Sequence, residues 1–175
     1  FAMRGDRARE LGVTSLTDLV AAAPQLTVGG DPEFFERPEW LAVRDAYGLR
    51  FGQSRNFAPT FMYNALQSGE ADVISAYTSD GRIAADKLVV LADPKGALPS
   101  YDALLMLSPR IAEDKGVIAA LEPLLGAISV EAMREANLAV DREDAKKLTP
   151  KAAAAELGKS LRRPGLDPGP LTTGR

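Results

Sequence analysis

Two tyrosines stand at turns where a small ligand could be held. Tyr77 ends the apolar part of ADVISAYTSDGRI (71–83), and Tyr101 follows a proline turn in LPSYD (98–102). Because α/β proteins place ligands where strands end, we expect Tyr77 at the rim of a site and Tyr101 as its partner across a cleft. A tyrosine face carries a negative quadrupole and attracts an organic cation such as a quaternary ammonium group by about 0.5–2 kcal/mol per ring. The pair therefore predicts recognition of a ligand rather than its chemical conversion.

The composition is that of an ordinary soluble globular chain and argues against several functions. The 175 residues are 46% hydrophobic and 26% charged, enough for one or two domains with a buried core. A formal charge of −3 gives no basic field for a nucleic acid. The absence of cysteine and histidine removes disulfides, the usual zinc sites, thiol nucleophiles and the commonest general base. Enzymatic turnover therefore has little support.

No apolar stretch approaches the roughly 18–20 residues of a membrane helix, and no basic and apolar signal peptide stands at the front. The chain begins with Phe1-Ala2-Met3, an apolar segment without an initiator methionine, which leads directly into structured sequence. We therefore expect a piece of a longer protein. The lack of cysteine is compatible with a location outside the cytoplasm.

The elements that must position the tyrosines alternate as in α/β folds. Capping residues and apolar spacing predict helices over 4–11, 16–23, 38–47 and 59–68. β-prone and apolar runs predict strands over 25–28, 49–53, 71–77, 87–92 and 103–107, which together form a mixed sheet. Gly29-Gly30 is interpreted as a turn, because the Lys-Ser/Thr of a phosphate loop does not follow. Trp40 and Phe35 are expected in the core rather than in a ligand site.

The last third is predicted to be helical. Helical sequence runs from Ser108 to Ile128 with breaks at Gly116 and Pro123, and further helices follow over 129–140 and 150–161. The tail 162–175 carries too little apolar surface to offset its ordering entropy, so it is predicted to be disordered.

Six motifs in one order carry a resemblance to a known family. They are LGVTSLTDLV, LTVGGDPEFFERPEW, YGLRF, YNALQSGEADVISAYTSDGRI, KLVVLADPKGALPSYDA and ISVEAMREANLAVD. Over about residues 1–160 the chain resembles the substrate-binding proteins of osmoprotectant ABC importers, which bind glycine betaine, choline and related quaternary amines. The resemblance implies an α/β fold of the type II periplasmic binding-protein class, an extracytoplasmic location, a membrane permease as partner, and neither catalysis nor a cofactor.

The resemblance also implies a division of the chain. Residues 1–98 would form the second ligand-binding lobe with its crossing strand, and 99–161 the return segment and C-terminal helices of the first lobe, whose N-terminal part the chain lacks. The ligand would lie in an aromatic cage between two lobes that close on it by a hinge motion.

Five residues match positions of the family's binding motifs. Tyr77 in AYTSDG and Tyr101 in LPSYD correspond to cage tyrosines, and Arg37 in EFFERP to an arginine expected to pair with a ligand carboxylate. Thr78 and Asp80 would be polar contacts or hinge supports. A cation together with Arg37 indicates a betaine or another zwitterion, whereas a cation held only by rings and an aspartate indicates a choline-like ligand. The sequence favours the zwitterion.

Three positions depart from the family's pattern and bear on the identity of the ligand. Ser75 and Ala58 stand where many relatives have acidic residues, and Asp102 stands where an aromatic residue is common. The class of ligand follows from the resemblance, but the particular amine does not.

Structural and functional alternatives stay open at this point. Tyr77 and Tyr101 could pack on loops, Arg37 could pair with nearby glutamates at the surface, and Asp80 could cap a helix. Instead of a transport protein, the chain could be the effector-binding domain of a regulator with the same fold, although no helix-turn-helix is seen.

Apolar residues of the C-terminal helices predict a further property, self-association. They are Ile118, Leu121, Leu124 and Leu125, and they would normally cover a sheet. We expect the chain to self-associate through them, or to leave these helices loosely packed.

Overall fold

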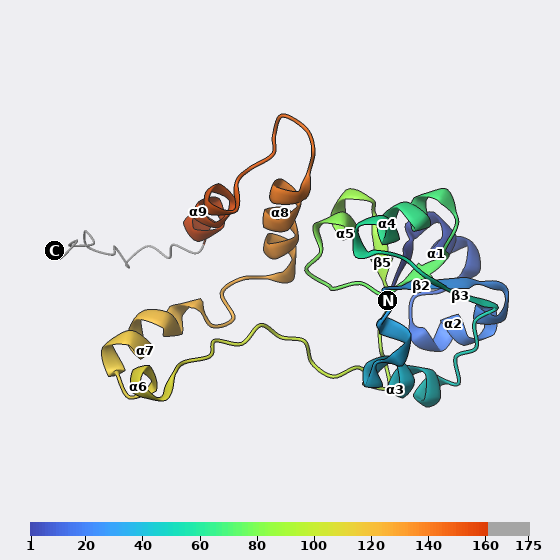
Figure 1. Cartoon of the computed structure of the whole chain (residues 1–175), viewed down its shortest axis with the longest axis horizontal. Helices are drawn as coiled ribbons and strands as arrows, with labels where there is room; N and C mark the ends of the chain where they lie inside the picture. Colours follow the sequence, from blue (N-terminus) through green and yellow to red (C-terminus); the bar gives the residue numbers. More distant parts are fainter. Residues whose placement is uncertain (161–175) are drawn as a thin grey trace. The chain divides into compact units, whose positions relative to one another are not determined.

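The computed structural model describes residues 1–160 (Figure 1). It contains two compact units, Phe1–Met106 and a second that begins at Leu107. The predicted disordered tail, 162–175, lies outside the described residues. Among residues 1–160, no helix has the length and apolar character needed to cross a membrane.

The first unit is a five-stranded sheet with helices on both faces. Its strands are β1 (Ala2–Arg4), β2 (Thr27–Gly30), β3 (Gln53–Asn56), β4 (Val73–Ile74) and β5 (Leu88–Val90). Its helices are α1 (Gly5–Leu11), α2 (Leu16–Ala22), α3 (Pro38–Tyr47), α4 (Pro59–Ser68) and α5 (Gly81–Ala85), with 3₁₀ turns η1 (Ala23–Gln25) and η2 (Phe34–Glu36). The strand order is β3-β2-β4-β1-β5; β2 runs parallel to β3 and β4, and β1 runs antiparallel to β4 and β5. The predicted mixed sheet is confirmed.

Side chains of the central strands alternate between two apolar clusters. Met3 and Val73 point into the cluster that contains α2 and α3, whereas Ala2 and Ile74 point into the cluster formed with α4 and α5. Figure 1 shows these helix pairs on opposite sides of the sheet. Because successive strand side chains face opposite ways, a run as short as two apolar residues contributes to both clusters. Each large side chain buried in this way stabilises the fold by about 1.5–3 kcal/mol.

The helices α1 to α4 begin and end within one residue of the predicted limits, whereas α5 was not among the predicted helices. Ser15 and Asp18 form the expected capping box at the start of α2, with the Asp18 amide 3.2 Å from Ser15 Oγ and the Ser15 amide 3.0 Å from the Asp18 carboxylate. Gly48 and Gly69 end α3 and α4 with φ of 67° and 78°, a left-handed conformation that glycine adopts without strain. Trp40, Val43 and Tyr47 are buried on one side of α3 as predicted.

Several predicted strands are shorter than expected or absent. The strand predicted over 49–53 is wrong, because β3 begins only at Gln53 and consists of four exposed residues that pair through their backbone with β2. The strand over 71–77 reduces to Val73–Ile74, so Tyr77 lies in the following loop. The apolar run 103–107 forms no regular structure and is exposed. Conversely, the apolar start of the chain forms β1, which pairs on both sides.

The turn predicted at Gly29-Gly30 is also wrong, since both glycines lie inside β2. They are needed there because neighbouring rings approach the backbone. A Cβ on Gly29 would lie 3.0 Å from the Phe57 ring, and one on Gly30 would lie 2.5 Å from Phe34 Cδ1. A glycine within a strand often marks such an approach.

We predict that Gly30→Ala lowers the free energy of unfolding by about 1–3 kcal/mol through overpacking. The Phe34 side chain cannot easily move away from the added methyl group, because its ring packs against Phe1 and Trp40 at centroid distances of 5.8 and 5.5 Å. Urea denaturation followed by Trp40 fluorescence measures the effect. Gly158→Ala in α9 is the contrasting variant, because its Cβ would meet no atom within 4 Å and alanine is favoured over glycine in a helix, so it should not destabilise. Equal stability of Gly30→Ala and the wild type would contradict the steric argument.

The second unit is helical, as predicted. It contains α6 (Pro109–Ala112), α7 (Lys115–Leu121), η3 (Glu122–Leu124), α8 (Val130–Asp141) and α9 (Pro150–Ser160). The break predicted at Gly116 lies two residues earlier, between α6 and α7: Asp114 caps α7 by accepting hydrogen bonds from the Gly116 and Val117 amides, which places Gly116 in the first turn. The break predicted at Pro123 is confirmed, because α7 ends at Leu121 and a 3₁₀ turn follows. The amide of Leu148 donates to the carbonyl of Ala139 at 2.7 Å, which ties the segment before α9 to α8.

Candidate functional site

The structure brings the two predicted tyrosines together within the first unit. Tyr77 lies in the loop between β4 and α5, and Tyr101 lies beyond β5. Their ring centroids are 5.9 Å apart at an interplanar angle of 60°, and the two residues are 59% and 58% exposed. Two tilted rings that keep most of their surface open to solvent could share one organic cation. A pair that served only packing would be expected to be more deeply buried.

A residue that the sequence did not single out holds Tyr101 in place. The Tyr101 hydroxyl donates to Glu39 Oε1 at 2.8 Å, and Glu39 lies in the first turn of α3. This hydrogen bond raises the pKa of Tyr101. The pKa of Glu39 is lowered by its own backbone amide and by the Tyr101 hydroxyl, so its carboxylate is ionised at neutral pH. In the sequence, the only indication of a role for Glu39 was its position two residues after Arg37.

Arg37 lies near the other ring but is already paired. It precedes α3, and its Nη2 lies 3.5 Å from Asp31 Oδ1 and 3.3 Å from Glu33 Oε2. The charge of Asp31 raises the pKa of Arg37, and the Tyr77 hydroxyl raises that pKa further by a smaller amount. The structure therefore brings Arg37 near Tyr77, with two carboxylates next to its guanidinium, and its binding of a ligand carboxylate stays a prediction.

Thr78 and Asp80 follow Tyr77 in the same loop. Thr78 is exposed. Asp80 is the N-cap of α5 and accepts a hydrogen bond from the Arg82 amide at 3.4 Å. This confirms the alternative that Asp80 caps a helix. Burial, together with the neighbouring Asp80 carboxylate, raises the pKa of Tyr63. Asp80 thus supports the end of the loop that carries Tyr77.

The loop that leads to Tyr101 is fastened to α3. Asp93 accepts hydrogen bonds from the buried Tyr47 hydroxyl and, at 2.8 Å, from the Leu98 amide. The Tyr47 hydroxyl accepts in turn from the Lys95 amide at 2.7 Å, and Lys95 Nζ lies 4.8 Å from the centre of the Tyr47 ring. We call Tyr47, Asp93, Lys95 and Leu98 the loop anchor. It fixes the polypeptide three residues before Tyr101.

Trp40 and Phe35 pack together as expected, at a centroid distance of 5.6 Å. Trp40 is 7% exposed and belongs to the apolar core. The two rings therefore support the start of α3, where Arg37 is the N-cap residue and Glu39 lies in the first turn.

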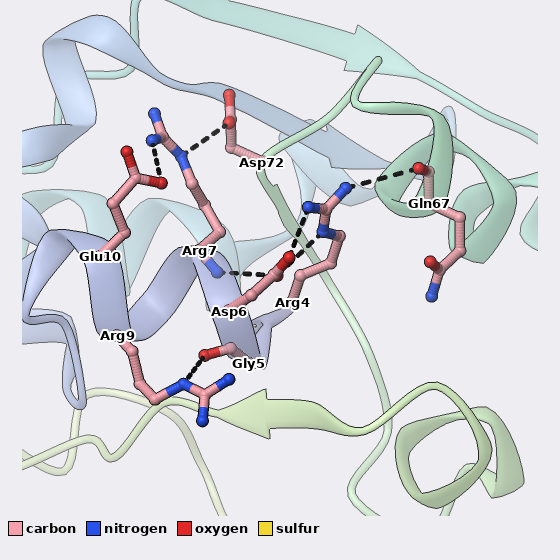
Figure 2. Close-up of polar contacts among 8 residues, drawn as sticks. All are labelled: Arg4, Gly5, Asp6, Arg7, Arg9, Glu10, Gln67 and Asp72. Carbon is pink, nitrogen blue, oxygen red and sulfur yellow. Dashed lines mark hydrogen bonds and ion pairs between the residues drawn. The ribbon is translucent and has the colours of Figure 1, made fainter.

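An ionic cluster beside α1 borders a separate cavity of about 290 Å³ (Figure 2). Arg7 lies 2.8 Å from Glu10 and 3.7 Å from Asp72, and Asp72 also accepts from the Thr27 amide at 2.9 Å. Neither tyrosine of the pair nor Arg37 lines this cavity. Because its charges are paired and Asp72 holds β2, the cluster is a structural element. Within residues 1–160, no group of three metal-ligating side chains is placed to hold a metal ion.

Known proteins are similar to this chain in sequence and fold. Residues 1–157 match the family described as the substrate binding domain of ABC-type glycine betaine transport system, OpuAC. The carnitine transport binding protein OpuCC of Listeria monocytogenes is 29% identical over 144 residues, which cover 81% of this chain and 47% of that protein. A glycine-betaine-binding protein of Pseudomonas aeruginosa is 32% identical over 169 residues, which cover 89% of this chain and 53% of that protein.

Solved structures agree with these matches. The crystal structure of a glycine betaine/carnitine/choline ABC transporter matches with a TM-score of 0.79 and 26% identity, covering 92% of this chain and 60% of that chain. The predicted fold class is thereby confirmed. The chain spans about half the length of the curated relatives it matches.

Proposed function

We infer the function from family membership, because this chain belongs to the family of substrate binding domains of ABC-type glycine betaine transport systems. We propose that it takes part in capturing a quaternary-ammonium osmoprotectant. The ligand would be glycine betaine, choline or a related amine, and it would be delivered to the membrane permease of an importer. The relatives named as carnitine- and glycine-betaine-binding proteins support this class of ligand. They give no support to the alternative of a regulator's effector domain.

The observation that carries the proposal is the exposed tyrosine pair, whose rings lie 5.9 Å apart. Two rings contribute together about 1–4 kcal/mol to the binding of a cation, which by itself corresponds to weak affinity. Polar neighbours must therefore add to binding. Arg37 and Glu39 supply charges of opposite sign next to the pair, and Thr78 and Asp80 supply polar groups in the loop of Tyr77.

The division of the chain into lobes is part of the same proposal. Residues 1–98 would be one ligand-binding lobe, and 99–161 would be the return segment and C-terminal helices of the other lobe. In the structure the first part of this return segment, with Tyr101, still belongs to the compact unit Phe1–Met106. The family assignment supports a place outside the cytoplasm, at the outer face of the membrane or in a periplasm.

Isothermal titration tests the function directly. The chain is titrated with glycine betaine, choline, carnitine and ergothioneine in one buffer. We expect saturable heat with at least one of them and none with a neutral isostere of choline, 3,3-dimethylbutanol, in which carbon replaces the charged nitrogen. Absence of heat from all four amines at millimolar concentration would contradict the proposal for this chain.

Apolar side chains at the surface support the further proposal that copies of this chain associate. Leu104 is 82% exposed, Met106 is 89% exposed and Leu125 is 64% exposed. Leu104 and Met106 lie two residues apart in one exposed segment, and contiguous apolar surface tends to find a partner in water. We predict a concentration-dependent mass above that of the monomer in size-exclusion chromatography with light scattering. A monodisperse monomer whose amides in α7 and α8 resist hydrogen exchange would contradict this prediction.

A further inference from the structure

The charged side chains around the tyrosine pair are arranged asymmetrically. Glu39 bonds directly to Tyr101, whereas Arg37 lies near Tyr77 with Asp31 and Glu33 on its guanidinium. Of these four charged side chains three are carboxylates and one is a guanidinium, so their summed charge is negative. A ligand lying against both rings would meet the Glu39 carboxylate at Tyr101, and near Tyr77 a guanidinium whose Nη2 already lies next to two carboxylates.

We propose that Glu39 is a specificity-determining residue, which makes the tyrosine pair favour a net cationic quaternary amine over a zwitterion. This inference rests on the proposed function and goes beyond it, because it assigns the choice between choline-like and betaine-like ligands to one side chain. It also reverses the ligand preference inferred from the sequence, where Arg37 indicated a zwitterion.

The physical basis is the different charge of the two ligands. A choline-like ligand carries only the ammonium charge, which the Glu39 carboxylate attracts from the edge of the cage. A betaine carries the same cation with a carboxylate a few ångströms away, and the attraction and repulsion by Glu39 largely cancel. Arg37 could add attraction by binding the betaine carboxylate, but its guanidinium would then interact with Asp31 and Glu33 as well. Such interactions at a surface with effective dielectric constant of about 20 or more change affinity by about three- to tenfold.

Glu39→Gln separates the charge from the hydrogen bond. The amide oxygen of glutamine can still accept from the Tyr101 hydroxyl, so the ring stays in place while the negative charge is lost. We expect choline to bind about three- to tenfold more weakly, and glycine betaine to change by about twofold or less, in parallel titrations at low salt. Glu36→Gln is the matched control, because Glu36 lies in the preceding 3₁₀ turn and is exposed. It should leave the ratio of the two affinities unchanged.

Arg37→Gln gives the reciprocal measurement. If Asp31 and Glu33 neutralise Arg37, this variant should strengthen choline and leave betaine nearly unchanged. If betaine instead weakens about tenfold in Arg37→Gln while Glu39→Gln weakens both ligands equally, the inference is overturned and Arg37 determines specificity. Binding of neither ligand to the wild type would overturn the proposed function, and the inference with it. Binding of both with an unchanged ratio in Glu39→Gln would overturn the inference alone.

Discussion

Replacing Tyr77 by alanine is expected to weaken the binding of a quaternary amine by about tenfold, and replacing Tyr101 as well by about a hundredfold in total. The reason is the loss of one or both aromatic faces from a pair whose rings lie 5.9 Å apart. Because both residues are more than half exposed, the free energy of unfolding should change by only about 0.5 kcal/mol. Titration calorimetry measures the affinity, and urea denaturation the stability.

Two further variants show whether the ring face is the cause. Tyr77→Phe keeps the face and should retain affinity within about twofold. Phe61→Ala removes an aromatic ring that is 62% exposed in α4, outside the pair, and should have no effect on binding. If Tyr77→Ala binds as well as the wild type does, the tyrosine pair is not the ligand site.

Replacing Asp93 by alanine is expected to have the largest effect on stability, about 2–4 kcal/mol. The change deprives the Tyr47 hydroxyl and the Leu98 amide of their acceptor, and hydrogen bonds to a charged group contribute about 1.5–3 kcal/mol each. The buried Tyr47 hydroxyl loses the acceptor for its proton. Because the loop anchor ends three residues before Tyr101, ligand affinity should also fall, by about three- to tenfold.

The contribution of Asp93 depends on pH in a predictable direction. Partial burial would raise the pKa of Asp93, but hydrogen bonds from the Leu98 amide and the Tyr47 hydroxyl outweigh it and hold that pKa below its usual value. Since the native pKa is lowered, this stabilisation is present at neutral pH and is lost as the pH falls through the acidic range. Asp102→Ala is the control, because Asp102 is exposed and, among the described residues, forms hydrogen bonds with its near neighbour Ser100. Equal destabilisation by the two variants would show that the loop anchor has no special role.

Helix ends were predictable from the sequence because their signals are local. Ser15 with Asp18, and the glycines after α3 and α4, act within one turn of the residues that they cap. The limits of strands were not predictable from the sequence, because a strand is defined by the neighbouring strand with which its backbone pairs. Residues 53–56 are polar and exposed but pair with β2, whereas the apolar run 103–107 has no described partner. The glycines in β2 were misinterpreted for the same reason: the rings of Phe34 and Phe57 approach them only in the folded chain.

The candidate site was predictable in its aromatic part and not in its charges. Tyr77, Tyr101 and Arg37 stand in motifs that a family resemblance can identify. The bond from Tyr101 to Glu39 joins residues 62 positions apart, and the bond from Tyr47 to Asp93 joins residues 46 positions apart. No spacing rule in the sequence indicates such contacts. They depend on how the loop after β5 lies against α3, which only the folded structure shows.

The polar outer strand has a consequence for aggregation. β3 is at the edge of the sheet, is only four residues long and exposes every side chain, including Arg55. A short, charged edge is a poor template for the backbone of another chain, which is how natural sheets avoid uncontrolled fibre-like growth. Association of copies through this edge is therefore disfavoured. Association of copies should instead depend on the apolar side chains between Leu104 and Ile128.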